Sequence, residues 1–200
     1  TAEQESGIAN IVSYREFFQN PMEIVGECIK AMSSGAKRVG IEMEFLPASD
    51  FGSLQRFLKG IELVPCDGLF TSMRMVKTER EIKLLRRIAK IAEEVHQELL
   101  SYARPGTTER DLARKILDEV VARGGRSIKL MVVGSGSRSR LPNAPFTDRK
   151  LVDGDVVRVD IIANLDHYYS DIARTFVVGH PKESQRRMWD HLVSVQQTIY

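Results

Sequence analysis

The sequence has no long hydrophobic run, no marked excess of charge of one sign and few cysteines. Its longest apolar runs fall far short of the roughly 20 residues that a bilayer-spanning helix needs, so we expect no membrane span. Lysine and arginine number 29 and aspartate and glutamate 27, a small and scattered difference that predicts no nucleic-acid partner. Cys28 and Cys66 lie far apart, which indicates reduced thiols in a cytoplasmic protein rather than a disulfide framework.

The length of 200 residues suits one or two domains, and the 42% of hydrophobic residues is enough to build a core. We find no signal peptide, internal repeat or low-complexity segment. The chain starts at Thr1 and stops at Tyr200 inside a helical pattern, so we expect it to be a piece of a longer protein.

The first 76 residues alternate predicted strands and helices, which favours a small parallel or mixed sheet covered by helices. One helix starts at Pro21, with Asn20 as its N-cap. Ser49 can cap a second helix that runs to about Leu58. The pattern changes at residues 71–77, and we place a domain boundary there. The predicted strands cover residues 8–14, 38–43 and 61–64.

The rest of the chain begins with two predicted amphipathic helices. Thr78 and Glu81 form a capping box for the first, which runs to about Leu100. After a break in the chain, Thr107 or Thr108 caps the second. Three predicted strands follow, with a long polar loop over residues 134–153 between the first two; they cover residues 129–133, 155–163 and 168–178.

The last two strands are separated by a short turn, so they should form an antiparallel hairpin. A two-residue turn at Leu165-Asp166, or a four-residue loop over residues 164–167, would place Asp160 directly opposite Asp171. Their Cβ atoms would then lie about 4.5 to 5.5 Å apart. Strict alternation puts the aspartates on one face and an apolar set on the other, which we expect to be core: Val157, Val159, Ile161 and Ala163.

Two ionised carboxylates at that spacing repel each other by roughly 3 kcal/mol at an effective dielectric constant near 20. One carboxylate can keep its proton, an arginine such as Arg158 or Arg174 can bridge the pair, or cations can bind between them. Alternation places Arg158, and not Arg174, on the face of Asp160. The pattern alone therefore leaves open an arginine-satisfied acidic pair and a two-metal hydrolase site.

The segment DGDVVRVDIIANLDHYYSDIARTFVVG resembles the metal-binding hairpin of the Xaa-Pro aminopeptidase, prolidase and creatinase family. RPGTTERDLA and SRLPNAPFTDRKLVDGD continue the resemblance in the family's order. The resemblance implies an α/β (α+β) fold in two parts. Residues 1–76 would be the latter part of a creatinase-type N-terminal domain, and residues 77–200 the first half of a pita-bread catalytic domain, an antiparallel sheet with covering helices.

The resemblance also implies an activity and a site. Asp160 and Asp171 would be two of five ligands for two divalent metal ions, manganese, cobalt or zinc. The metal-activated hydroxide would attack a peptide or small amide, as in an Xaa-Pro aminopeptidase or dipeptidase that cleaves the bond before proline. The protein would be a homodimer. The remaining ligands, one histidine and two glutamates, are expected beyond Tyr200, so the 200-residue segment alone is expected to be inactive.

One position departs from the family's pattern. Asn143 stands where the family's peptidases carry a histidine that contacts the substrate. Asparagine can donate a hydrogen bond but cannot carry a proton through a reaction, and Asn143 can equally be a turn residue before Pro145. The departure leaves an alternative open: a non-peptidase member of the fold, either a metal-free creatinase-like amidine or ring hydrolase or a catalytically inactive binding module.

Overall fold

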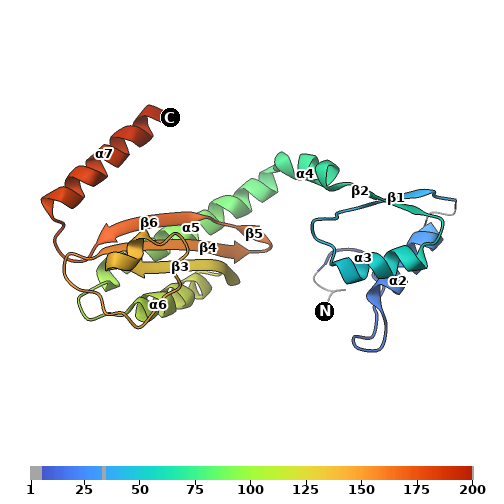
Figure 1. Cartoon of the computed structure of the whole chain (residues 1–200), viewed down its shortest axis with the longest axis horizontal. Helices are drawn as coiled ribbons and strands as arrows, with labels where there is room; N and C mark the ends of the chain where they lie inside the picture. The colour runs from blue at the N-terminus through green and yellow to red at the C-terminus, as the bar shows by residue number, and fades with distance from the viewer. Residues whose placement is uncertain (1–5, 33–34, 200) are drawn as a thin grey trace. The chain divides into compact units, whose positions relative to one another are not determined.

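The computed structural model describes residues 6–32 and 35–199. The chain divides after Val76 into two compact units, which we describe separately (Figure 1).

The first unit packs helices against a small parallel sheet. In that sheet Val39 pairs with Leu63. The N-cap predicted for the first helix is confirmed, because the backbone N–H of Met22 donates to Asn20 Oδ1 at 2.9 Å. The elements of this unit are α2 (Pro21–Met32), β1 (Arg38–Ile41), α3 (Ala48–Phe57), β2 (Glu62–Pro65) and α4 (Asp67–Met75).

Three details of the first unit differ from the sequence-based prediction. Residues 8–14 form no strand, and most of them are exposed. Their β-branched residues favour a strand only where a partner strand is available to pair with, so this prediction is wrong. Ser49 is not a cap, since α3 begins one residue earlier with Pro47 at its N-cap. Helix α4 was not expected, and it buries no residue among those described.

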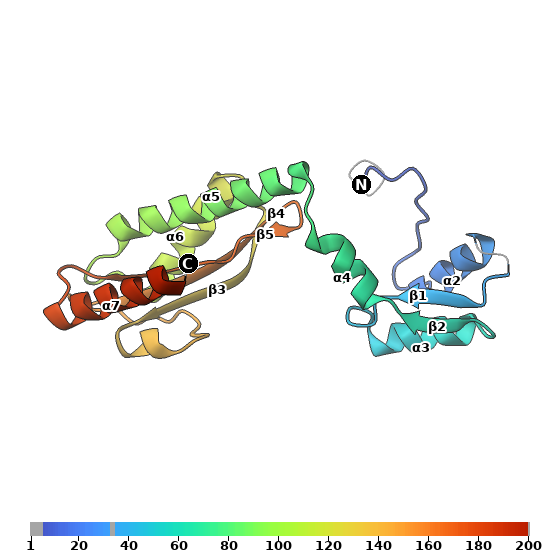
Figure 2. The ribbon, with the colours of Figure 1, turned by 90° about the horizontal axis from the view of Figure 1, so that it is seen from above.

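The second unit is a curved antiparallel sheet with two helices along one face (Figure 2). Strand β4 is central, and it pairs with β3 on one side and with β5 and β6 on the other. The loop that contains η1 lies on the side of the sheet opposite α5 and α6 (Figure 2). The elements are α5 (Glu79–Tyr102), α6 (Glu109–Ala122), β3 (Ser127–Ser135), η1 (Gly136–Arg140), β4 (Val156–Leu165), β5 (Tyr168–Tyr169), β6 (Ile172–Val177) and α7 (Glu183–Ile199).

The core of this unit lies between the sheet and helices α5 and α6. The predicted core face of β4 is confirmed, because Val157, Val159, Ile161 and Ala163 are each 0% exposed. They pack with the apolar stripes of the two helices, and burying each large aliphatic side chain is worth about 1.5 to 3 kcal/mol. Helix residues in this core include Ile88, Val95, Leu99, Leu112, Ile116 and Val120.

Helices α5 and α6 each start with a capping box, at Thr78 with Glu81 and at Thr108 with Asp111. The Glu81 carboxylate accepts the backbone N–H of Thr78 at 2.6 Å and the hydroxyl of Tyr168 at 2.7 Å. These bonds lower the pKa of Glu81 to about 2, and the bond from the Thr78 backbone has the larger effect. The cap of α5 is therefore also a contact with β5.

The hairpin between β4 and β5 turns at Asp166 and His167, not at Leu165-Asp166. Both turn residues have positive φ, 48° and 68°, as a two-residue type I′ turn requires. Leu165 stays in the strand because it is buried, at 4% exposure, and a leucine is poorly suited to positive φ. The predicted register is consequently wrong by two residues: Asp160 pairs with Ala173, and not with Asp171.

A fully buried carboxylate, that of Glu109, fastens the loop between β3 and β4 to the start of α6. It accepts the N–H and hydroxyl of Ser135 at 2.8 and 2.7 Å, and those of Thr147 at 2.9 and 2.7 Å. Arg138 Nε adds a longer contact at 3.3 Å. Burial raises the pKa of Glu109, but the bonds from Thr147 and Ser135 outweigh burial and leave the pKa below its ordinary value.

No described helix is both long and apolar enough to cross a membrane. Cys28 and Cys66 are free thiols.

The turn at His167 generates a stability prediction. His167→Gly should raise the free energy of unfolding by about 0.5 to 1 kcal/mol, because glycine adopts positive φ without strain. His167→Val should lower it by about 1 to 2 kcal/mol, since a β-branched residue is strained there. His180→Gly is the control, because His180 is exposed but not among the positive-φ residues. Denaturant unfolding measures all three, and a His167→Gly no more stable than wild type or a neutral His167→Val would contradict the turn assignment.

The buried Glu109 generates a second prediction. Glu109→Gln should lower the free energy of unfolding at pH 7 by about 1 to 3 kcal/mol, because an amide cannot accept all the donors around it. A depressed pKa stabilises the fold above the ordinary value of 4.5 and loses that contribution as the pH falls, so the difference from wild type should shrink below that pH. Asp148→Asn is the control: its carboxylate is 75% exposed, so the expected change is much smaller than that of Glu109→Gln. A difference that grows in acid would refute this role.

Candidate metal and substrate site

Asp160 lies near the middle of β4, on the face opposite the core. Its side chain is 17% exposed, and its Oδ2 lies 3.7 Å from Arg158 Nη2. Its Oδ1 is buried and has no hydrogen-bond partner among the described residues. A buried carboxylate oxygen without a donor is costly, by about 1 to 3 kcal/mol or more. Asp160 therefore presents an acceptor for which the described residues offer no donor.

Asp171 lies between β5 and β6 and is exposed. Its neighbour Ser170 is buried and bonds to Ala163 in both directions, which points Ser170 to the core and Asp171 to the other face. The register places Asp171 across from Ile162, two residues along β4 from Asp160. The aspartates thus share one face as diagonal neighbours, a relation that holds residues about 7 to 8 Å apart.

Arg158 is the arginine that reaches Asp160. It also donates from Nη1 to the carbonyl oxygens of Leu141, at 3.2 Å, and Pro142, at 2.7 Å. Arg174 instead donates to the carbonyl of Ala173. Within the described part of the chain, no ion pair joins either arginine to Asp171, so arginine contact offsets the charge of one carboxylate rather than bridging both.

Asn143 is exposed and lies in a turn of the loop that follows η1. The residue before it, Pro142, is held through its carbonyl by Arg158, and the residue after it, Ala144, is 2% exposed. Across the described residues, no hydrogen bond engages the Asn143 amide. The loop backbone is fixed while this side chain is free, which fits a ligand-facing residue and also the simple turn residue that the sequence left open.

Further contacts fix the loop, and the sequence analysis missed them. Arg138 Nη2 donates to the carbonyl of Pro145 at 2.6 Å. Arg149 forms a two-bond ion pair with Asp155, at 2.6 and 2.9 Å, and donates to Ser135 Oγ. Glu109 in the sequence reads as an ordinary first-turn acid after Thr108. No local signal predicts its burial, because the groups that surround it come from residues 26 and 38 positions away.

His96 on α5 is a buried histidine that the sequence analysis also missed. Its Nδ1 lies 2.7 Å from the carbonyl of Ala92, and its Nε2 is buried without a partner among the described residues. Burial lowers the pKa of His96, which favours the neutral ring. It lies in the core on the far side of β4 from Asp160. His167, His180 and His191 are exposed.

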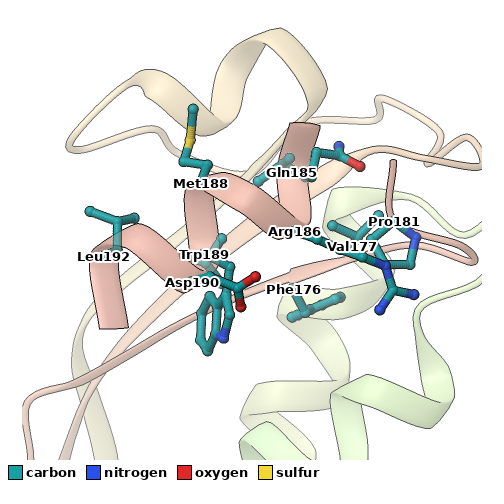
Figure 3. A pocket seen from close by; sticks show the side chains of 11 residues that line it. Phe176, Val177, Pro181, Gln185, Arg186, Met188, Trp189, Asp190 and Leu192 are labelled. Carbon is teal, nitrogen blue, oxygen red and sulfur yellow. The ribbon is translucent and has the colours of Figure 1, made fainter. Parts of the chain in front are cut away.

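A groove of about 440 Å³ runs between the sheet and α7. Figure 3 shows Met188, Trp189 and Leu192 of α7 around it, near Phe176 and Val177 of β6. Neither Asp160 nor Asp171 lines this groove.

The donor chemistry at the aspartates suits hard divalent cations, which prefer carboxylate oxygens. No described side chain donates a hydrogen bond to Oδ1 of Asp160, so this oxygen is available to a cation. Among residues 6–32 and 35–199, no three histidine, cysteine, aspartate or glutamate side chains come together as a metal cluster. Asp160 and Asp171 are thus a partial donor set.

Both parts of the chain match known protein families. Residues 83–200 match the family model described as Metallopeptidase family M24, and residues 1–76 match that of the Creatinase/Prolidase N-terminal domain. An Xaa-Pro dipeptidase of Pyrococcus horikoshii is 32% identical over 171 residues, 85% of this chain and 48% of that protein. The uncharacterized peptidase YqhT of Bacillus subtilis is 32% identical over 165 residues, 82% of this chain and 47% of that protein.

The fold is also similar to solved structures. An Xaa-Pro dipeptidase from Bacillus anthracis superimposes with a TM-score of 0.81 at 28% identity, over 90% of this chain and 50% of that one. The prolidase from Pyrococcus horikoshii gives a TM-score of 0.78 at 31% identity, over 87% of this chain and 50% of that one. The predicted fold class, a creatinase-like α/β domain followed by pita-bread architecture, is confirmed.

The chain spans about half the length of the curated relatives that it matches. One family model alone covers more than half of its residues, and a second covers the first 76. The chain belongs to metallopeptidase family M24, and its first 76 residues match the model of the Creatinase/Prolidase N-terminal domain.

Proposed function

We propose that this chain is part of a metal-dependent peptidase of the Xaa-Pro dipeptidase or aminopeptidase kind, which hydrolyses the bond before proline. The observation that carries the proposal is the buried, unpartnered Oδ1 of Asp160 on the face that it shares with Asp171. Relatives named as Xaa-Pro dipeptidases support the reaction and the peptide substrate. Residues 1–76 would be the latter part of the N-terminal domain, and residues 77–200 the first half of the catalytic domain.

In this proposal Asp160 and Asp171 hold two divalent cations, manganese, cobalt or zinc, together with ligands from outside these 200 residues. Such cations supply Lewis-acid polarisation of a carbonyl and activation of water. This chain's part is to fix the two carboxylates on a rigid strand pair, with apolar packing behind β4 to hold their direction. The 200-residue segment alone would lack activity, because two carboxylates are too few ligands.

Asn143 has a more limited part than the histidine at the corresponding family position. Its amide can donate a hydrogen bond to a substrate oxygen and stabilise developing negative charge there. It cannot accept and return a proton, so any proton transfer must use another group. The proposal further includes a homodimer and a cytoplasmic location, the latter supported by the free thiols of Cys28 and Cys66.

The alternative is a binding module or a metal-free hydrolase, and Asn143 is the observation that favours it. A member of the fold that makes no use of a cation has no need of a proton-carrying residue at this position. The two functions differ in what they require of Asp160, which makes Asp160 the residue to test.

Asp160→Asn in the full-length protein should abolish bound metal and lower the hydrolysis of an Xaa-Pro dipeptide by at least about a hundredfold, because a charged ligand is lost. The apo fold should change by less than about 1 kcal/mol, since a buried unpartnered charge is removed with it. Asp166→Asn is the control, a carboxylate-to-amide change in the same hairpin, at 48% exposure. Metal content by mass spectrometry and a dipeptide assay provide the readouts. Full activity in Asp160→Asn, or wild type that retains no manganese, cobalt or zinc, would favour the alternative.

A further inference from the structure

The guanidinium of Arg158 lies between the two parts of the proposed site. Through Nη1 it holds the carbonyl oxygens of Leu141 and Pro142, at 3.2 and 2.7 Å. Through Nη2 it faces Oδ2 of Asp160 at 3.7 Å. One side chain thus contacts the carboxylate that we assign to the metal and the backbone that immediately precedes Asn143.

The two contacts differ in kind. Those to the carbonyls are hydrogen bonds, whereas 3.7 Å to Asp160 is beyond hydrogen-bond length and is a charge contact only. Both side chains are largely shielded from water, with Arg158 29% and Asp160 17% exposed, so the charges are weakly screened. A cation at Asp160 would therefore meet the fixed positive charge of Arg158 while the hydrogen bonds to the loop stay in place.

The loop depends on Arg158 near Asn143. Glu109 fastens the loop at Ser135 and Thr147, and Arg138 fastens it at Pro145. Between these anchors, the carbonyls of residues 141 and 142 contact Arg158 directly before the exposed Asn143. Loss of Arg158 would leave Glu109 and Arg138 in place and free the stretch that carries the candidate substrate contact.

We propose that Arg158 is a positioning residue with two opposite effects: it holds Asn143 in place for the substrate, and it weakens cation binding at Asp160. This inference rests on the proposed function. Removing Arg158 should strengthen metal binding and at the same time slow the reaction. Loss of a residue with a general structural role would instead weaken both.

The test is Arg158→Met in the full-length protein, which keeps an unbranched side chain and removes the charge and the donors. The dissociation constant for Mn²⁺, measured by titration calorimetry, should fall about three- to tenfold. At saturating Mn²⁺, kcat for an Xaa-Pro dipeptide should fall about ten- to a hundredfold, because the substrate contact is displaced. Hydrogen exchange at the amides of Leu141, Asn143 and Ala144 should accelerate at least about tenfold in protein without metal.

Two further variants serve as controls. Arg158→Lys keeps the charge but not the forked donors, so the Mn²⁺ dissociation constant should stay within about twofold of wild type while exchange in the loop accelerates. Arg174→Met removes a cation from the adjacent strand whose guanidinium donates to its neighbour's carbonyl, and it should change none of the three quantities by more than about twofold. If Arg158→Met fails to fold, Arg158→Lys and its loop exchange decide the anchoring.

Unchanged loop exchange and kcat in Arg158→Met would overturn the anchoring, and an unchanged or higher Mn²⁺ dissociation constant would overturn the effect on the cation. Wild type that binds no manganese, cobalt or zinc and hydrolyses no dipeptide would refute the proposed function and, with it, the effect on the cation. The exchange comparison in metal-free protein would still decide the anchoring in that case.

Discussion

The packing of one face of β4 on α5 and α6 is the constraint on which the rest of the second unit depends. Val157, Val159, Ile161 and Ala163 are fully buried, and because side chains alternate along a strand, a slip of one residue would bury Asp160 and expose these four. The hydrophobic effect on these four residues thereby directs the Asp160 carboxylate to the opposite face. No contact made by Asp160 itself is needed for this. The turn at Asp166 and His167 then sets how far along that face Asp171 lies.

The sequence predicted the elements whose signals are local. The caps at Asn20, Thr78 and Thr108, and the core alternation of β4, follow from residues within a few positions of one another. The strand predicted at residues 8–14 failed because strand formation depends on a partner, and the sequence alone does not show one. The predicted register was wrong because both candidate turns include Leu165. Moving this residue from the core into the turn, where φ is positive, would be costly.

The sequence predicted that Asp160 and Asp171 share a face, but not their positions relative to each other. Asp160 and Asp171 share a face as expected, since a register error of two residues preserves the face, but they are diagonal rather than opposed. Glu109, Arg149 and the second contact of Arg158 are tertiary: each joins groups that are distant in sequence, and each uses a residue type that is ordinary on a surface. Together they hold the Asn143 loop with buried charge, which is costly to form but rigid once every partner is satisfied.

In the proposed function the unpartnered oxygen of Asp160 is a metal ligand, and Asp171 completes its side of the site. Crystals of the full-length protein grown with Mn²⁺ and measured with X-rays near the manganese absorption edge test it directly, because anomalous scattering locates manganese independently of the protein. We expect anomalous peaks from manganese about 2 to 2.3 Å from carboxylate oxygens of both Asp160 and Asp171. This expectation would be contradicted by a map without such peaks in which a protein side chain donates a hydrogen bond to Asp160 Oδ1.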